Sequence, residues 1–148
     1  MAHWIIPSNP NKYKMIKAFA ELGMLDQQTK NLIKKGDTVF IYQSSPVSKI
    51  VLETIVINDN VPAQDLFYDG NYFVDEKSKK EIEQKGKKSK HIRLQLVTYF
   101  DDSINNKLVF EQLVKNGYKG KMQGTIRLEK NPQLFDYIKR VINNLDML

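Results

Sequence analysis

Two polar clusters follow apolar strands at separate points of the chain, and their side chains suit a flat polar ligand. Ser8-Asn9 comes directly after Trp4-Ile5-Ile6-Pro7, and Tyr42-Gln43-Ser44 closes a strand that begins after Gly36-Asp37. Amides both donate and accept hydrogen bonds, hydroxyls adapt their geometry, and a tyrosine ring offers a face for stacking. The pattern predicts that the two strand ends converge on a polar, aromatic site.

A flat ligand such as a nucleobase taken out of its helix would be held by aromatic stacking and by hydrogen bonds to its polar edge. Unstacking costs on the order of a few kcal/mol, and base–aromatic stacking supplies about 1–3 kcal/mol per base. Tyr42 or Tyr13 offers the stacking face. The predicted pocket for a flat ligand consists of Trp4, Ser8, Asn9, Tyr13, Tyr42, Gln43, Ser44, Gln123 and Gly124.

Three of these residues also have a purely structural explanation. Asn9 stands before a helical stretch, where asparagine commonly caps the helix or forms an Asx turn. Trp4 alternates with Ile5 and suits a core position in which its N–H finds a partner. Gly124 permits a close backbone approach, and a strand bulge explains it equally well. The sequence leaves both explanations open for each residue.

The formal net charge of +6 is concentrated in one segment. Residues 77–93 hold seven lysines and Arg93 against Glu81 and Glu83, so the rest of the chain is neutral. A basic stretch suits a polyanion, because neutralising phosphates releases counterions. A solvated loop that only aids solubility is the alternative. The predicted phosphate contacts are Lys85, Lys87, Lys88, Lys90, Arg93 and Arg127, the last with an ion pair to Glu129 as its alternative.

The composition argues against catalysis, metals and cofactors. The chain has no cysteine and two histidines, which leaves no thiolate site and few zinc ligands. The stretch Gly117-Tyr118-Lys119-Gly120-Lys121 resembles a phosphate-binding loop, but Met122 stands where a P-loop needs serine or threonine. Asp101 and Asp102 are adjacent, so on a strand they point to opposite faces. We expect a protein that is not an enzyme.

Length and hydropathy indicate one cytoplasmic domain. The 148 residues fit a single domain over 1–148, with a lysine-rich excursion at about 75–90. The apolar runs fall far short of the roughly 20 residues that a membrane span needs. No basic segment precedes an apolar one at the N-terminus, so we expect no targeting segment and no membrane partner.

Hydrophobic periodicity predicts a mixture of strands and helices. Strands are expected over 2–6, 38–43, 49–58 and 91–100, with a strand or turn over 122–128. Helices are expected over 11–22, over 27–33 as a short helix or turn, over 108–116, and from Asn131-Pro132 onward. Residues 59–90 are expected to form an irregular excursion with at least one helical turn.

The order of these features resembles the EVE domain proteins of the PUA-like superfamily, which also includes the YTH and ASCH domains. The resemblance rests on the first strand ending in Ser8-Asn9-Pro10, the Gly36-Asp37 turn into a Val-Phe-Ile-Tyr strand, the Ser44-Ser45-Pro46 exit, and Gln123-Gly124-Thr125-Ile126 before a terminal helix. It implies an α+β PUA-like pseudo-barrel of about five or six strands with flanking helices.

The resemblance also implies a pocket that accepts a modified base flipped out of nucleic acid. We therefore expect a non-catalytic nucleic-acid-binding module that reads a methylated cytosine or adenine in DNA or RNA. A small-molecule sensor, or a protein-interaction module that uses the same pocket, is the alternative.

Overall fold

The structure, a computed structural model, describes residues 1–66, 72–80, 90–101, 104 and 106–144. Within these residues a single sheet of six strands runs in the order β2-β5-β4-β3-β1-β6. The strands are β1 (His3–Ser8), β2 (Met24–Thr29), β3 (Thr38–Gln43), β4 (Lys49–Asn58), β5 (Lys90–Tyr99) and β6 (Ile126–Arg127). The helices are α1 (Met15–Leu22), α4 (Phe110–Lys115) and α5 (Pro132–Asn143), with short 3-10 turns η1 (Ala63–Asp65) and η3 (Leu128–Lys130).

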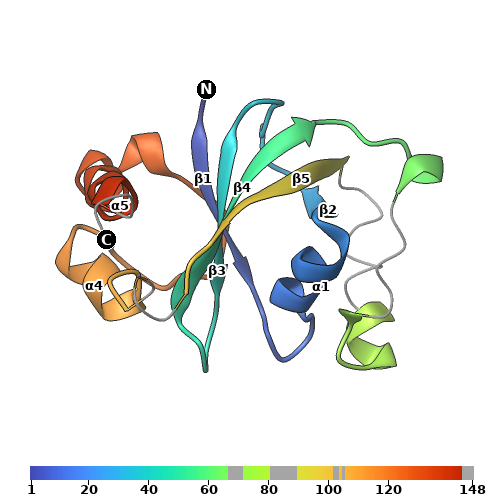
Figure 1. The fold of residues 1–148 in the computed structure, drawn as a ribbon, viewed down its shortest axis with the longest axis horizontal. Helices are drawn as coiled ribbons and strands as arrows, with labels where there is room; N and C mark the ends of the chain where they lie inside the picture. The colour runs from blue at the N-terminus through green and yellow to red at the C-terminus, as the bar shows by residue number, and fades with distance from the viewer. Residues whose placement is uncertain (67–71, 81–89, 102–103, 105, 145–148) are drawn as a thin grey trace.

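The sheet is strongly twisted and curls into a half-barrel (Figure 1). Strand β1 pairs in parallel with β3, and every other neighbouring pair is antiparallel. Strands β2 and β6 are the two ends of the strand order, so the described sheet leaves an open seam along them. This α+β half-barrel confirms the predicted PUA-like pseudo-barrel.

Alternating side chains divide the interior into two cores on opposite faces of the sheet. Trp4 and Ile6 belong to the core that α1 covers, whereas Ile5 between them belongs to the core under α4 and α5. Figure 1 shows α1 on one side of the sheet and α4 and α5 on the other. Because successive strand residues point to opposite faces, alternate positions along a strand pack into alternate cores.

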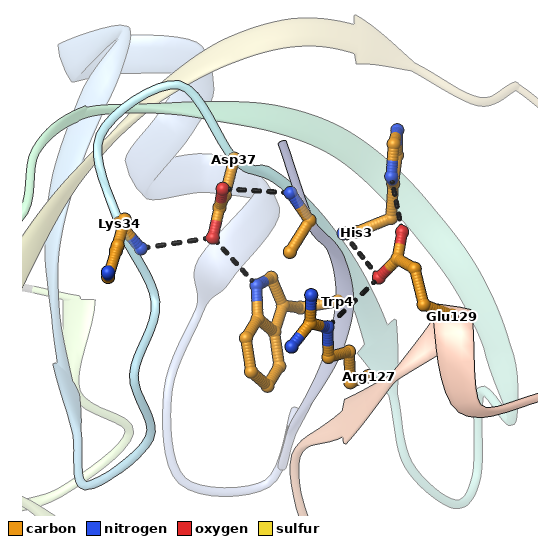
Figure 2. A network of polar contacts seen from close by, with 7 residues as sticks. His3, Trp4, Lys34, Asp37, Arg127 and Glu129 are labelled. Carbon is orange, nitrogen blue, oxygen red and sulfur yellow. Dashed lines mark hydrogen bonds and ion pairs between the residues drawn. The ribbon is translucent and has the colours of Figure 1, made fainter.

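A buried carboxylate secures the start of β1. Asp37 accepts hydrogen bonds from the Ala2 N–H, the Lys34 N–H and the Trp4 indole Nε1, each at 3.0 Å (Figure 2). Burial raises the pKa of Asp37, but these hydrogen bonds outweigh it, so the net pKa lies below its ordinary value of 3.8. The network fixes the orientation of Trp4, whose ring faces the seam.

Most predicted elements are confirmed, with shifted ends. The strands at 38–43 and 49–58 have the predicted bounds, and the C-terminal helix begins at Pro132 with Asn131 Oδ1 accepting the Leu134 N–H at 3.2 Å. The first helix begins at Met15 rather than residue 11, because the Asn9 carbonyl closes a turn with the N–H groups of Lys12 and Tyr13.

The predicted helix or turn at 27–33 is wrong over its first half. Residues Met24–Thr29 form strand β2, which pairs antiparallel with β5 from Met24 opposite Gln95 to Thr29 opposite Lys90. Pairing with a long neighbouring strand overrides the weak local preference of Asp-Gln-Gln-Thr. This correction matters because β2 forms one side of the seam. No helix in the described part of the chain is long and apolar enough to cross a membrane.

Candidate functional site

Two adjoining hollows lie along the seam. The first, here called the cleft, has a volume of ≈ 1170 Å³ and lies between β2, the end of β1 and the Tyr13 turn. The second, here called the groove, has a volume of ≈ 870 Å³ and lies between the segment after β2 and residues 117–133. Lys30, Asn31 and Thr125 line both hollows, so the two form one continuous surface.

Uncharged polar groups dominate the cleft. Strand β2 and the segments around it supply amides and hydroxyls to the lining. The amides are Asn9, Gln27, Gln28, Asn31 and Gln123, and the hydroxyls are Ser8, Thr29, Ser44 and Thr125. Such a lining offers donors and acceptors in many directions. Lys12 and Lys30 add positive charge to it.

Two aromatic rings form a wall of the cleft. Tyr13 and Phe73 both line it, with ring centroids 4.8 Å apart and an interplanar angle of 69°. Backbone hydrogen bonds bring their segments together, because the Lys14 N–H donates to the Tyr72 carbonyl at 2.7 Å and the Val74 N–H donates to the Lys12 carbonyl at 2.8 Å. A ring from the 72–74 segment is thereby set against the turn that follows β1.

The carboxylate in the cleft lining is already paired. Arg93 donates from Nε and Nη2 to the two oxygens of Asp26, at 2.9 and 3.2 Å, and from Nη2 to the Asp65 carbonyl at 2.7 Å. The hydrogen bond to Asp26 raises the pKa of Arg93 above its ordinary value. Arg93, predicted as a phosphate contact, is thus committed to a carboxylate and lines neither hollow.

The two predicted strand ends do converge. Ser8 lies opposite Gln43 in the parallel pairing of β1 with β3, and the Ser44 N–H donates to the Ser8 carbonyl at 2.9 Å. The Ser44 hydroxyl donates to the same carbonyl at 3.3 Å. The predicted pocket residues that the structure brings into the cleft are Ser8, Asn9, Tyr13, Ser44 and Gln123.

The other predicted pocket residues lie elsewhere. Tyr42 lies two positions after Phe40 on β3 and therefore faces the same side of the sheet. It is buried in the core under α4 and α5, where burial raises the pKa of its hydroxyl. Gln43 is buried at the end of β3, and Gly124 is exposed; neither lines a hollow. Trp4 is buried in the first core, as its structural explanation required, and its remaining exposed edge lines the groove.

Asn9 forms an Asx turn. Its Oδ1 accepts the Asn11 N–H at 2.9 Å, whereas α1 starts only at Met15, so Asn9 does not cap that helix. The residue is exposed at the rim of the cleft. Within the described residues its Nδ2 has no hydrogen-bond partner, so the structural role of Oδ1 leaves a donor available.

The groove carries a different chemistry. Its charged lining residues are Lys30, Lys119, Arg127 and Lys130, and no carboxylate belongs to the described lining. The Arg127 guanidinium lies 5.7 Å from the Trp4 ring centroid, and its Nε donates to Glu129 at 3.4 Å (Figure 2). Arg127 therefore lines the groove and also makes the ion pair that the sequence offered as its alternative role.

The remaining predicted phosphate contacts are placed unevenly. Lys85, Lys87 and Lys88 lie outside the described residues. The Lys90 ammonium donates to the Ile33 carbonyl at 3.0 Å and lines neither hollow. Within the described ranges, no group of three or more histidine, aspartate or glutamate side chains is arranged to hold a metal ion.

Sequence reasoning missed residues on both sides of the seam. In the cleft it missed Gln27, Gln28 and Phe73, and in the groove it missed Lys30, Lys119 and Lys130. A strand assignment for 24–29 would have indicated the two glutamines. The Gly-Tyr-Lys-Gly-Lys stretch signalled a basic turn, although it was considered only as a possible P-loop.

The fold and its polar seam define a PUA-like module. The chain belongs to the EVE domain family, whose profile matches residues 2–132. This match confirms the resemblance read from the sequence. A search among curated proteins found no significant match.

Solved ASCH structures share the fold. The chain is similar to an ASCH protein from Zymomonas mobilis, with a TM-score of 0.57 and 13% identity over 93% of this chain and 94% of that one. A serine-to-alanine mutant of that protein gives a TM-score of 0.56 at 12% identity, over 94% of this chain and 95% of the other. Identities this low show a common fold and leave the ligand to be argued from the site.

Proposed function

We propose that this protein is a non-catalytic nucleic-acid-binding module that holds one extruded, modified base in the cleft. The observation that carries the proposal is the composition of the cleft, where amides, hydroxyls and two aromatic rings share one hollow without an unpaired carboxylate in the described lining. A base presents a π face and an edge of alternating donors and acceptors, which this lining complements.

The size and the apolar part of the cleft suit a methylated base. Ligand pockets commonly measure about 300–1,000 Å³, so a hollow of ≈ 1170 Å³ has room for a base with its sugar. Met15, Leu25, Leu66 and Met122 supply apolar atoms to the lining. Burying one added methyl group is worth about 0.8 kcal/mol, which corresponds to a preference of about fourfold for the methylated base.

The described side chains favour binding over chemistry. Asp26 is held by Arg93, and His91 lines the cleft with no hydrogen-bonded acid or base among the described residues. A general base needs a reacting proton within reach and a group that orients it. The arrangement supports a role in recognition.

The experiment is equilibrium binding of the purified protein to matched DNA and RNA oligonucleotides. Each carries an unmodified cytosine or adenine, or its methylated or hydroxymethylated form, and binding is measured at two salt concentrations. We expect a preference for one modified base that persists at the higher salt. Binding without preference, absence of binding, or equal affinity for an isolated metabolite would each overturn the proposal.

A matched pair of substitutions tests the cleft itself. Asn9→Asp keeps the oxygen that accepts the Asn11 N–H but removes the Nδ2 donor and places a charge at the rim. We expect about tenfold weaker binding of the preferred oligonucleotide, within the roughly 1–3 kcal/mol that a good base contact supplies. Asn11→Asp adds the same charge two residues away, outside the cleft lining, and should change affinity far less. Equal losses in both variants would remove Asn9 from the site.

A further inference from the structure

We infer that the groove is the track for the backbone phosphates of the strand whose base occupies the cleft, with Lys30, Lys119 and Lys130 as the phosphate contacts. The inference rests on the proposed function and adds to it the path of the bound strand. It assigns phosphate contacts to residues that lie far apart in the sequence and outside the lysine-rich segment.

The two hollows are placed for one continuous ligand. Lys30, Asn31 and Thr125 line both of them, so a strand that leaves the cleft enters the groove directly. Lys30 follows β2 and Thr125 precedes β6, which are the two ends of the sheet. The open seam of the half-barrel is therefore the route that connects base and backbone.

The charge of the groove is unbalanced. Lys30, Lys119 and Lys130 are exposed, and none has an ion-pair partner within the described part of the chain. Only Arg127 among the groove cations contacts a described carboxylate, that of Glu129 at 3.4 Å. Cations gathered in a hollow raise the local concentration of a polyanion and speed its association.

The turn that presents Lys119 is held in place. Gly117 and Gly120 flank it with φ of 111° and 91°, values that favour glycine. The Gly117 carbonyl accepts a hydrogen bond from Asn131 Nδ2 at 2.9 Å, and Tyr118 is buried in the core under α4 and α5. Because the turn is tied to the start of α5, Lys119 needs little ordering when a phosphate arrives.

The apolar residues of the groove favour a nucleotide strand over a small inorganic anion. Leu32 lines the groove with 78% of its surface exposed, an unusual position for leucine among cations. The edge of Trp4 lies nearby in the same lining. Sugars and bases that flank the bound nucleotide offer apolar surface that would cover both side chains.

The test compares two double substitutions that remove equal charge. Lys119→Gln with Lys130→Gln removes two groove contacts, and Lys17→Gln with Lys107→Gln removes two exposed lysines that line neither hollow. Each lost phosphate contact lowers the slope of log affinity against log salt by about 0.7 for single strands, so the groove variant should lose about 1.4. We expect about tenfold weaker oligonucleotide binding at moderate salt. Equal slopes in the two variants would overturn the inference.

The sole tryptophan supplies an independent readout. Trp4 lines the groove but not the cleft, so an oligonucleotide should change its emission, whereas the isolated preferred nucleoside should not. Unchanged emission with a bound oligonucleotide would contradict the track. If the wild-type protein binds no oligonucleotide, the proposed function itself fails; if it binds with base preference and the groove variant behaves like its control, only the track fails.

Discussion

The cleft and the groove share one seam but differ in the interactions they offer. The cleft gathers amides, hydroxyls and the Tyr13–Phe73 pair, and its lining carboxylate is bound by Arg93. The groove gathers four basic side chains with no carboxylate in the described lining. In nucleic-acid complexes, base contacts specify and phosphate contacts position. In the proposed function, the cleft and the groove divide these two tasks between them.

The two edges of the seam carry features that disfavour pairing with other chains. Exposed strand edges are templates for association, and proteins protect them with short edge strands and charged side chains. Strand β6 has two residues, Arg127 is one of them, and Lys30 directly follows β2. The basic side chains that suit a phosphate backbone in the proposed function also protect the two strand edges.

The largest expected effect concerns Asp37, which supports the groove through Trp4. Asp37→Asn weakens an acceptor of three hydrogen bonds and sets an NH₂ group against N–H donors, so we expect the free energy of unfolding to fall by about 3 kcal/mol. Urea unfolding measures the loss. The emission of Trp4 should also shift in the folded variant.

The control for Asp37 is Asp59→Asn. Asp59 accepts a single hydrogen bond at an exposed site, from the Lys35 N–H at 3.0 Å, and its substitution should cost less than about 1 kcal/mol. Equal losses of unfolding free energy in the two variants would show that the buried network around Asp37 adds no more stability than one exposed hydrogen bond.

The next effect separates the cleft from the opposite core. Phe73→Ala removes a ring from the cleft wall, so affinity for the preferred oligonucleotide should fall by about 5- to 150-fold, equivalent to 1–3 kcal/mol, with the salt slope unchanged. Tyr42→Phe alters a tyrosine on the other face of the sheet and should leave affinity unchanged. Binding titrations at several salt concentrations measure both. A selective loss in Tyr42→Phe would mean that the Tyr42 hydroxyl, on the other face of the sheet, contributes to binding.

The central strands could be predicted from sequence, but the seam could not. Strand β4 has a long run of β-branched residues, so its bounds followed directly from local pattern. Strand β2 is a sheet edge with polar Gln27 and Gln28, which blurs the alternation and favours a turn assignment. The sequence places Tyr42 in the pocket because its neighbours Gln43 and Ser44 are polar. On β3, however, Tyr42 faces the same side as Phe40 and packs into the other core.

The groove was beyond sequence reasoning for a different reason. Lys30, Lys119 and Lys130 meet only because the two ends of the sheet curl toward one another. Local charge density instead drew attention to residues 77–93. Even the identified Arg127 needed the structure, which shows that it contacts Trp4 and Glu129 at the same time.

The smallest expected effect arises at Glu129, on the border of the groove. Burial raises the pKa of Glu129, but hydrogen bonds from the His3 N–H at 3.0 Å and His3 Nδ1 at 2.8 Å outweigh it and lower the pKa below its ordinary value of 4.5. The ionised form therefore adds stability above about pH 4.5, and that stability is lost as the pH falls through the lower folded value. The contribution should be under about 1 kcal/mol, because the side chain is partly exposed.

Glu129→Gln tests both the stability and the division of tasks. Its free energy of unfolding should differ from that of the wild type near neutral pH and converge with it as the pH falls through the lowered pKa of Glu129. The substitution also weakens the ion pair with Arg127, which leaves that side chain available to a phosphate. The slope of log affinity against log salt should therefore increase in magnitude by up to about 0.7, while the base preference stays unchanged. A changed base preference would mean that the groove takes part in reading the base, and the separation between the two hollows would no longer hold.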